Sequence, residues 1–382
     1  MEQHHTFMQR ALALARQVEG YTSPNPVVGA VVVRGGQIVG EGYHRRAGAP
    51  HAEVEALHAA GQRAHGATLY VTLEPCNHYG RTPPCTEALI KAGIAQVFYA
   101  TSDPNPLVAG SGHRRLVEAG LAVHQGPCTA EAQLLNRFFF HYIRTKQPYT
   151  VAKFAASLDG KIATHTGHSQ WITGDAARQK GHTLRHRVDA ILIGANTAIA
   201  DNPRLTTRLP QPEVRHPLRI VLDSRGRVPP TATLFQPDLP GQTIVATTEA
   251  MPLYHQTHLK QQGIKILTLP ATPVGQVDIE ALLIALGRRH VTSLMVEGGS
   301  ETLGTFFERG YVNEVWAFIA PMIIGGQGAP GPVGGTGFAA LAQACRLQSP
   351  TVETVGCDFL LRGFVQSTLT PTMQTIETLE RS

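Results

Sequence analysis

The chain has 382 residues, of which 42% are hydrophobic and 16% are charged, and its formal net charge is +5. This composition is typical of a globular protein and excludes a disordered chain, and the length favours two domains that each bury a core. The positive charge is spread out, with no dense Lys/Arg block among aromatic residues, and no apolar run approaches the ~18 residues of a membrane span, so we expect a cytoplasmic protein that binds neither nucleic acid nor membranes.

The first part of the chain predicts helices that alternate with short strands. Helical spacing of apolar residues predicts helices over 7–18, 52–60, 112–119 and 130–143, and a further helix that opens at Cys85. Apolar, β-rich runs predict strands over 27–33, 37–43, 68–73, 96–100 and 122–124. We therefore expect a mixed sheet with helices along it.

Three residues of metal-binding types and one carboxylate have a spacing in this part that indicates a metal site. His51 precedes Glu53 by two residues, and Pro75-Cys76 is followed by Cys85. One imidazole and two thiolates suit Zn²⁺ and leave a fourth position for water, which the metal makes acidic enough to attack near neutral pH. Glu53 is then free to carry the proton to a leaving amine. The pattern predicts a zinc-dependent deaminase with one zinc ion per chain, although eight residues separate the cysteines where the usual motif has two.

The expected positions of the ligands support this interpretation. Cys85 and His51 are predicted at helix N-termini, where exposed N–H groups and the helix dipole favour a thiolate. Three alternatives stay open. His78 or His44 would complete a closed structural zinc site, the cysteines would be unrelated to a metal, or they would form a disulfide. The disulfide is the least favoured, because five cysteines show no disulfide framework and fit a reducing compartment.

Longer stretches of this part resemble a known family. They are SPNPVVGAVVV (23–33), GEGYHRRAGAPHAEVEAL (40–57), YVTLEPCNHYGRTPPCTEALI (70–90) and DPNPLVAGSG (103–112). They are similar to the deaminase half of the bifunctional riboflavin-biosynthesis enzymes, which join diaminohydroxyphosphoribosylaminopyrimidine deaminase to 5-amino-6-(5-phosphoribosylamino)uracil reductase. The spacing of the cysteines matches that family. The resemblance implies that His51, Cys76 and Cys85 bind zinc and that Glu53 shuttles the proton. It also suggests that Asn25, His44 and the loop 78–81 line the pyrimidine pocket, although each also suits a role in stabilising its own loop.

A polar connection over 144–148 separates a second part with a different pattern. Strands are predicted over 150–156, 188–194, 219–223, 243–247, 264–267, 293–296 and 314–319, with helices over 279–286 and 302–309. Strands that alternate with helices predict a largely parallel, doubly wound sheet. Gly298-Gly299 between a strand and a helix suits a phosphate-binding turn, and equally a tight turn without a ligand. The glycine-rich stretch 325–337 is either a mobile loop or a nucleotide contact.

This second part resembles the reductase half of the same family. The resemblance rests on VAKFAASLDGKIA (151–163), SQWITG (169–174), DNPRLTTR (201–208), RIVLDS (219–224) and VEGGSETLGTFF (296–307). It implies a dihydrofolate-reductase-like fold that uses NADPH. The implied cofactor contacts are Ala155, Trp171, Thr197, Asp201, Gly299, Ser300, Glu301, Thr302, Leu303, Gly304 and Thr305. The implied substrate contacts are Ser169, Arg185, Leu205, Arg208 and Glu297.

Charged residues of this part suggest finer roles. Arg185 and Arg208 suit the phosphate of the substrate through fork-shaped hydrogen bonding, although ordinary exposed arginines are the alternative. Ser224, Arg225 and Arg227 follow a strand and are candidates for the 2′-phosphate of NADPH. Lys153 or Asp201 is a candidate for assisting proton transfer to the opened ribose.

Together the resemblances imply a deaminase domain over 1–146, a reductase domain over 149–366 and a flexible tail over 367–382. The expected substrates are phosphorylated pyrimidines, which are first deaminated and then reduced at the ribosyl group, and the family suggests a homo-oligomer. Two other functions are weighed against this one. A nucleic-acid base deaminase would use the same zinc motif, but the second half and the lack of a basic, aromatic groove argue against it. A non-catalytic zinc-stabilised binding module would keep all its functions after loss of the Glu53 carboxylate.

Overall fold

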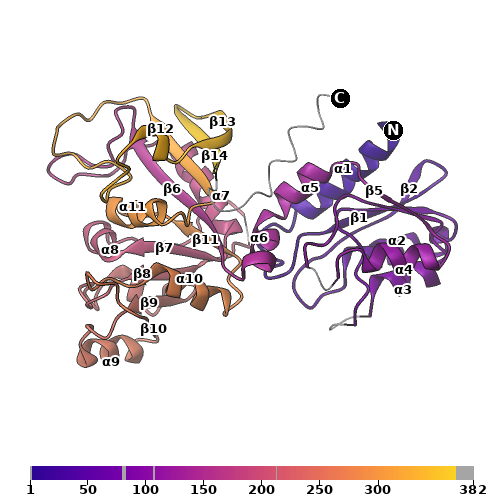
Figure 1. The fold of residues 1–382 in the computed structure, drawn as a ribbon, viewed down its shortest axis with the longest axis horizontal. Helices are drawn as coiled ribbons and strands as arrows, with labels where there is room; N and C mark the ends of the chain where they lie inside the picture. The colour runs from indigo at the N-terminus through magenta and orange to yellow at the C-terminus, as the bar shows by residue number, and fades with distance from the viewer. Residues whose placement is uncertain (1, 80–82, 106–107, 212, 367–382) are drawn as a thin grey trace. The chain divides into compact units, whose positions relative to one another are not determined.

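The computed structural model of the chain describes residues 2–79, 83–105, 108–211 and 213–366. The chain separates into two compact units, residues 1–146 and 147–382 (Figure 1). The tail expected over 367–382 lies outside the described residues. Within the described ranges, no helix has the length and apolar character needed to cross a membrane.

The first unit is built on a five-stranded sheet in the order β2-β1-β3-β4-β5. Its strands are β1 (Gly29–Arg34), β2 (Gln37–Tyr43), β3 (Thr68–Val71), β4 (Gln96–Tyr99) and β5 (Ala122–Gln125). Its helices are α1 (Glu2–Arg16), α2 (Ala52–Ala60), η1 (Gly61–Ala64), α3 (Cys85–Lys91), α4 (Ser111–Glu118), α5 (Thr129–Leu135) and α6 (Arg137–Thr145). β1 pairs antiparallel with β2 and β3, whereas β3, β4 and β5 run parallel. The expected mixed sheet is confirmed.

Close backbone packing fixes α2 against this sheet. A Cβ atom added to Gly40 of β2 would lie 2.3 Å from the carbonyl oxygen of Ala56, and one added to Gly42 would lie 2.4 Å from its backbone nitrogen. The alanine-rich face of α2 and these glycines therefore let helix and strand approach more closely than larger side chains allow. This packing fixes the position of the first turn of α2, which carries Glu53 and directly follows His51.

The single helix predicted over 130–143 is wrong, because the chain forms two helices there. α5 ends at Leu135 and α6 begins at Arg137. Between them, Asn136 is buried, and its side-chain amide exchanges two hydrogen bonds with the backbone of Val27, at 2.8 and 2.9 Å. A side chain that bonds a distant backbone segment in this way competes with a continuous helix.

The second unit contains a nine-stranded sheet in the order β10-β9-β8-β7-β11-β6-β12-β14-β13. Its strands are β6 (Tyr149–Ser157), β7 (Ala190–Gly194), β8 (Leu218–Leu222), β9 (Thr243–Thr247), β10 (Lys265–Thr268), β11 (Ser293–Val296), β12 (Glu314–Ala320), β13 (Leu347–Val355) and β14 (Asp358–Val365). Its helices are α7 (Asp175–Arg187), α8 (Ala195–Asp201), η2 (Thr233–Phe235), α9 (Leu253–Gln261), α10 (Ile279–Gly287), α11 (Ser300–Glu308) and η3 (Leu341–Gln343).

Seven neighbouring strands of this sheet, from β10 to β12, are parallel, which confirms the predicted doubly wound α/β class. The antiparallel pair β13–β14 at the other edge was not predicted, and neither were α7, α8 and α9. Every residue of β7 and β11 is buried, so both faces of the sheet centre are covered. Because parallel strands end at the same edge, the residues that follow β6, β7, β8 and β11 gather along one edge of this sheet.

Candidate metal centre and ligand cavity

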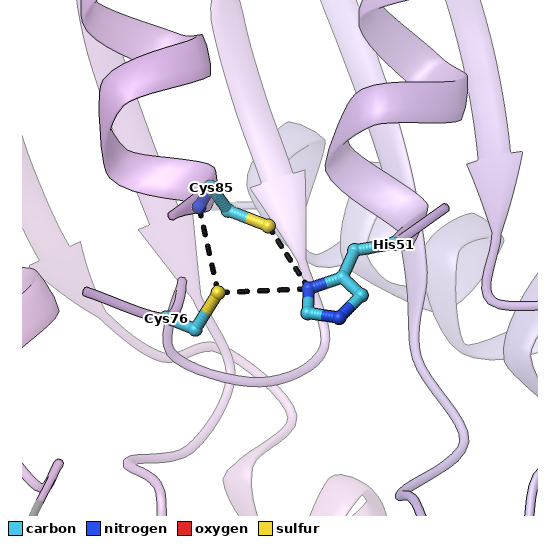
Figure 2. Close-up of side chains that lie close together, drawn as sticks. All are labelled: His51, Cys76 and Cys85. Atoms are coloured by element: carbon cyan, nitrogen blue, oxygen red, sulfur yellow. Dashed lines mark hydrogen bonds between the residues drawn. The ribbon is translucent and has the colours of Figure 1, made fainter. Parts of the chain in front are cut away.

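Three side chains that are far apart in sequence meet in the first unit (Figure 2). The Nδ1 atom of His51 lies 3.1 Å from Sγ of Cys85 and 3.5 Å from Sγ of Cys76. The backbone N–H of Cys85 donates to Sγ of Cys76 at 3.4 Å. All three ligand atoms lie within 4.8 Å of one another. One nitrogen and two sulfur atoms so arranged are a donor set that fits Zn²⁺.

Two helix starts and one strand end hold these side chains. His51 is the N-cap of α2, Cys85 is the first residue of α3, and Cys76 follows β3 by a few residues. Figure 2 shows the N-terminal ends of both helices directed toward the cluster. Unpaired N–H groups and the helix dipoles favour negative charge there, which suits thiolate ligands.

The structure bears on the alternatives that the sequence left open. All five cysteines are free, so Cys76 and Cys85 form no disulfide. His44 is buried and both its ring nitrogens are engaged, one with the Pro50 carbonyl at 3.0 Å and the other with the Asn25 amide at 3.1 Å. His78 is exposed. Among the described residues, no fourth protein ligand joins the group of three.

The carboxylate of Glu53 lies beside the cluster without belonging to it. Glu53 is buried in the first turn of α2. Burial and, next, the charge of Cys76 raise its pKa to about 7, against the opposing effect of His51. A hydrogen bond from the Cys85 thiol contributes most to lowering the pKa of Cys76, to about 4. A carboxyl group poised near neutrality next to a thiolate-rich cluster suits proton transfer.

The expected pyrimidine-pocket residues differ in their freedom to bind a ligand. His44 is fully engaged and holds the Asn25 side chain, whose amide nitrogen faces the imidazole at 3.1 Å. The amide oxygen of Asn25 has no hydrogen-bond partner within the described part of the chain. In the loop 78–81, Tyr79 is 82% exposed, and residues 80 and 81 lie outside the described residues.

The second unit contains a cavity of about 1080 Å³ along the edge where the parallel strands end. A volume of this size accommodates a nucleotide cofactor together with a small substrate. Almost every cofactor and substrate contact suggested by the resemblance lines it: Ala155, Ser169, Trp171, Arg185, Thr197, Asp201, Leu205, Arg208, Glu297, Gly299, Ser300, Glu301, Thr302, Leu303 and Thr305. Gly304 is not among the lining residues, because its backbone packs against Gly334.

A charge network lies in the wall of this cavity. Glu297 follows β11 and accepts hydrogen bonds from Nζ of Lys153 and Nη2 of Arg185, both at 2.6 Å. Burial alone would raise the pKa of Glu297, but Arg185 and Lys153 together lower it to about 2. The carboxylate therefore stays ionised. Arg185 also donates to the Thr206 carbonyl at 2.8 Å, so both terminal nitrogens of its guanidinium bond the protein, whereas its buried Nε has no hydrogen-bond partner among the described residues.

The turn after β11 permits a close backbone approach. Gly299 has a φ of 60° and is the N-cap of α11, and a Cβ atom there would lie 2.9 Å from Oγ1 of Thr197. A Cβ atom on Gly298 would lie 2.9 Å from the Ile193 side chain. Only glycine fits this turn without displacing its neighbours, and the first turn of α11 presents N–H groups of the kind that bind anions at helix N-termini.

Two cavity residues were missed from the sequence. His182 on α7 is buried, and its Nδ1 atom has no hydrogen-bond partner among the described residues. Burial and then the charges of Arg185 and Arg208 lower the pKa of His182 to about 4, so its ring is neutral. Arg204 also lines the cavity. The pKa of the Arg208 guanidinium is lowered most by burial, then by the charge of Arg185 and then by that of Arg204. Nothing local marks His182 in the sequence, because its surroundings come from segments distant in the chain.

Family models match both units. The cytidine and deoxycytidylate deaminase zinc-binding region matches residues 1–101, and the RibD C-terminal domain matches residues 148–361.

Relatives match the chain almost from end to end. The riboflavin biosynthesis protein RibD of Actinobacillus pleuropneumoniae is 45% identical over 95% of this chain and 96% of its own length. RibD of Escherichia coli is 42% identical over 94% of this chain and 98% of its own length. Two solved structures each cover 96% of this chain and 99% of their own chains. Acinetobacter baumannii RibD has 38% identity and a TM-score of 0.85, and the deaminase/reductase of Thermotoga maritima has 36% identity and a TM-score of 0.84.

Proposed function

The chain belongs to the RibD family of bifunctional deaminases and NADPH-dependent reductases of riboflavin biosynthesis, and from this premise we propose which of its residues carry the two reactions. The proposed substrates are those after which the Thermotoga maritima enzyme is named: a diaminohydroxyphosphoribosylaminopyrimidine for the deaminase and 5-amino-6-(5-phosphoribosylamino)uracil for the reductase. The alternative of a nucleic-acid base deaminase is not favoured, since the relatives cover both units.

In the first unit, His51, Cys76 and Cys85 hold one zinc ion and Glu53 moves the proton. The observation that carries this proposal is the convergence of one imidazole and two sulfur atoms within 4.8 Å, with Glu53 buried beside them. A zinc ion bound by these three residues would supply an acidified water as the nucleophile for the ring carbon that bears the amino group. Glu53 accepts a proton from that water and delivers it to the departing nitrogen, so that ammonia leaves. Asn25, held by His44, orients the ring.

In the second unit, the chain supplies position and charge, while hydride donation is chemistry of NADPH. Glu297, kept ionised by Lys153 and Arg185, orients the ribose hydroxyls of the substrate. Because Arg185 is committed to Glu297 and Thr206, Arg208 is the better candidate for the substrate phosphate. Lys153 stays a candidate for proton delivery at the opened ribose.

The cofactor contacts proposed from the family line the same cavity. Ala155 and Trp171 are proposed for the nicotinamide end, with Thr197 and Asp201 from α8, and the turn from Gly299 to Thr305 for the phosphates. The proposal for the turn is supported by the glycines and by the start of α11.

An assay of the purified protein tests both halves at once. With the phosphorylated diaminopyrimidine and no NADPH, the deaminated uracil compound should accumulate. Adding NADPH should convert it to the ribityl compound with oxidation of one NADPH per product. Failure to release ammonia would contradict the first half, and release of ammonia without NADPH oxidation would contradict the second.

The assembly and the location of the protein stay predictions. Exposed apolar side chains along β13, β14 and the segment before them, among them Val352, Phe359 and Leu341, support a homo-oligomer. Light scattering of the purified chain measures that state directly. The five free cysteines fit a reducing compartment such as the cytoplasm.

A further inference from the structure

The turn that follows β8 places two arginines at the edge of the NADPH cavity. Ser224, Arg225 and Arg227 all line this cavity. β8 lies two strands from β11 in the order β8-β7-β11, which corresponds to about 10 Å. A cofactor whose phosphates lie at the turn after β11 can therefore reach this turn with its adenosine end.

A buried carboxylate holds the backbone of this turn through hydrogen bonds. Asp223 is 1% exposed, and its two oxygens accept the backbone N–H groups of Arg227 at 2.9 Å and Val228 at 2.7 Å. In sites for NADH, an acidic side chain at a strand end accepts from the ribose 2′-hydroxyl and repels a 2′-phosphate. Asp223 occupies a strand end but is turned into the protein, so its carboxylate is not available for that role.

The two arginines differ in what they already bind. Nη2 of Arg227 donates to Oδ1 of Asn196 at 2.8 Å, and Asn196 in turn donates to Glu301 at 3.1 Å. Arg225 is exposed, and within the described part of the chain it makes no hydrogen bond or ion pair. Arg225, unlike Arg227, therefore has guanidinium N–H groups that are free to bind a ligand.

The guanidinium of Arg225 nevertheless has a defined place. A Cβ atom added to Gly275 would lie 3.3 Å from Nη2 of Arg225, so the side chain lies against the turn at residues 272–276. Arg225 also lines a smaller recess of about 590 Å³, together with Gly275 and Glu249. Glu249 is exposed and makes no ion pair with Arg225 among the described residues.

We propose that Arg225 binds the 2′-phosphate of NADPH and is the residue that makes this site prefer NADPH over NADH. The inference rests on the proposed cofactor site in this cavity. A guanidinium presents a planar fork that matches two phosphate oxygens. Ser224 adds a second donor, because its Oγ accepts from the Val277 N–H at 3.0 Å and its own proton is not donated to any described residue.

The test compares two ligands that differ only in the phosphate concerned: adenosine 2′,5′-bisphosphate and adenosine 5′-phosphate. Titration calorimetry on the full chain should show that the wild type prefers the bisphosphate. Arg225→Ala should weaken binding of the bisphosphate roughly 10- to 100-fold, the range expected for a hydrogen bond to a charged group. The affinity for adenosine 5′-phosphate should not change. Arg225→Lys keeps the charge but not the planar pair of N–H donors, so its affinity for the bisphosphate should lie between those of the wild type and Arg225→Ala. Fluorescence titration with NADPH and NADH should give the same order.

Matched variants separate this inference from the proposal on which it rests. Arg227→Ala removes the neighbouring cation and should largely preserve the preference for the bisphosphate. If the wild type binds both nucleotides equally, the proposed NADPH site and the role of Arg225 both fail. If the wild type prefers the bisphosphate and Arg225→Ala keeps that preference with an unchanged melting temperature, only the role of Arg225 is overturned. If Arg227→Ala loses the preference for the bisphosphate and Arg225→Ala keeps it, the role of Arg225 is likewise overturned.

Discussion

The Nδ1 atom of His51 lies 3.1 Å from the Sγ atom of Cys85, so the starts of α2 and α3 meet at one point. Neither helix carries a side-chain N-cap hydrogen bond. A metal bound here would tie together the two helix ends and the strand end that carries Cys76. We therefore expect the metal to stabilise the first unit as well as to serve its reaction.

Substitution of Cys85 by Ser should remove zinc from the protein and lower the melting temperature of the first unit. Elemental analysis should give close to one zinc per chain for the wild type and much less for the variant. Treatment of the wild type with a strong chelator should reproduce the loss of stability, measured by calorimetry. Cys357→Ser, at an exposed cysteine of the second unit, is the matched control and should keep the metal. A variant at Cys85 with full zinc content would contradict the proposed ligand set.

Substitution of Glu53 by Gln should abolish deamination while zinc stays bound, because the carboxylate lies beside the ligands and not among them. Loss of a positioned proton carrier is expected to lower the rate about 10²- to 10⁴-fold. NADPH oxidation with the deaminated compound as substrate should be unchanged, since that site belongs to the other unit. Glu55→Gln, one half-turn further along α2, is the control and should remain active. Zinc loss in Glu53→Gln would mean that this side chain binds the metal.

Removal of the Glu297 carboxylate should destabilise the second unit strongly. Glu297→Ala leaves Lys153 and the buried Arg185 without their counter-charge, and breaking a buried pair in this way costs about 3–5 kcal/mol. Both tryptophans of the chain, at 171 and 316, belong to the second unit, so their fluorescence during urea unfolding reports on that unit. Lys180→Ala, which removes an exposed pair with Glu353, should change the free energy of unfolding by under about 1 kcal/mol. Equal effects of the two variants would contradict the buried network.

The sequence was sufficient to predict what depends on local spacing. The residue types and spacing around His51, Cys76 and Cys85 pointed to a metal centre, and the structure brings these three side chains together. Alternating apolar runs predicted the mixed sheet and the parallel sheet, and β9 and β11 have the predicted bounds. The signal for each strand lies within the strand itself, and the metal motif spans 34 residues from His51 to Cys85.

Features that depend on distant partners were not predicted. Asn136 ends α5 because it bonds Val27, a residue 109 positions away. Glu297 was expected to contact the substrate, but its pairing with Lys153 and Arg185 spans 144 and 112 residues and has no local signature. β13 is almost entirely exposed, so it lacks the apolar alternation that marks a strand packed on a core.

Replacement of Asn136 by Ala should destabilise the first unit. The amide of Asn136 satisfies both the N–H and the C=O of Val27 in a buried position, and each group left without a partner costs about 1–3 kcal/mol. When ionised, Asn136→Asp keeps the acceptor for the Val27 N–H but loses the donor to the Val27 carbonyl, so it should also destabilise the unit. At acidic pH the protonated carboxyl group regains an O–H donor, and the destabilisation should become smaller. Calorimetry resolves the transition of this unit, and an unchanged transition in Asn136→Ala would show that the backbone of Val27 finds other partners.

Acidification should weaken the second unit through His182. Its folded pKa of about 4 lies below the ordinary value of 6.5, because burial and the charges of Arg185, Arg208 and Lys153 outweigh the opposing effect of Glu297. Between these two pKa values the unfolded chain binds more protons than the folded chain, so the contribution of His182 to stability is full above pH 6.5 and is lost as the pH falls toward 4. The stability that ionised Glu297 contributes is lost only below about pH 4.5, because its folded pKa is about 2. Urea unfolding followed by tryptophan fluorescence should therefore show a steeper decline of stability from pH 6.5 to pH 4.5 in the wild type than in His182→Asn. Parallel curves for the two proteins over that interval would mean that the imidazole is protonated as easily in the folded state as in the unfolded chain.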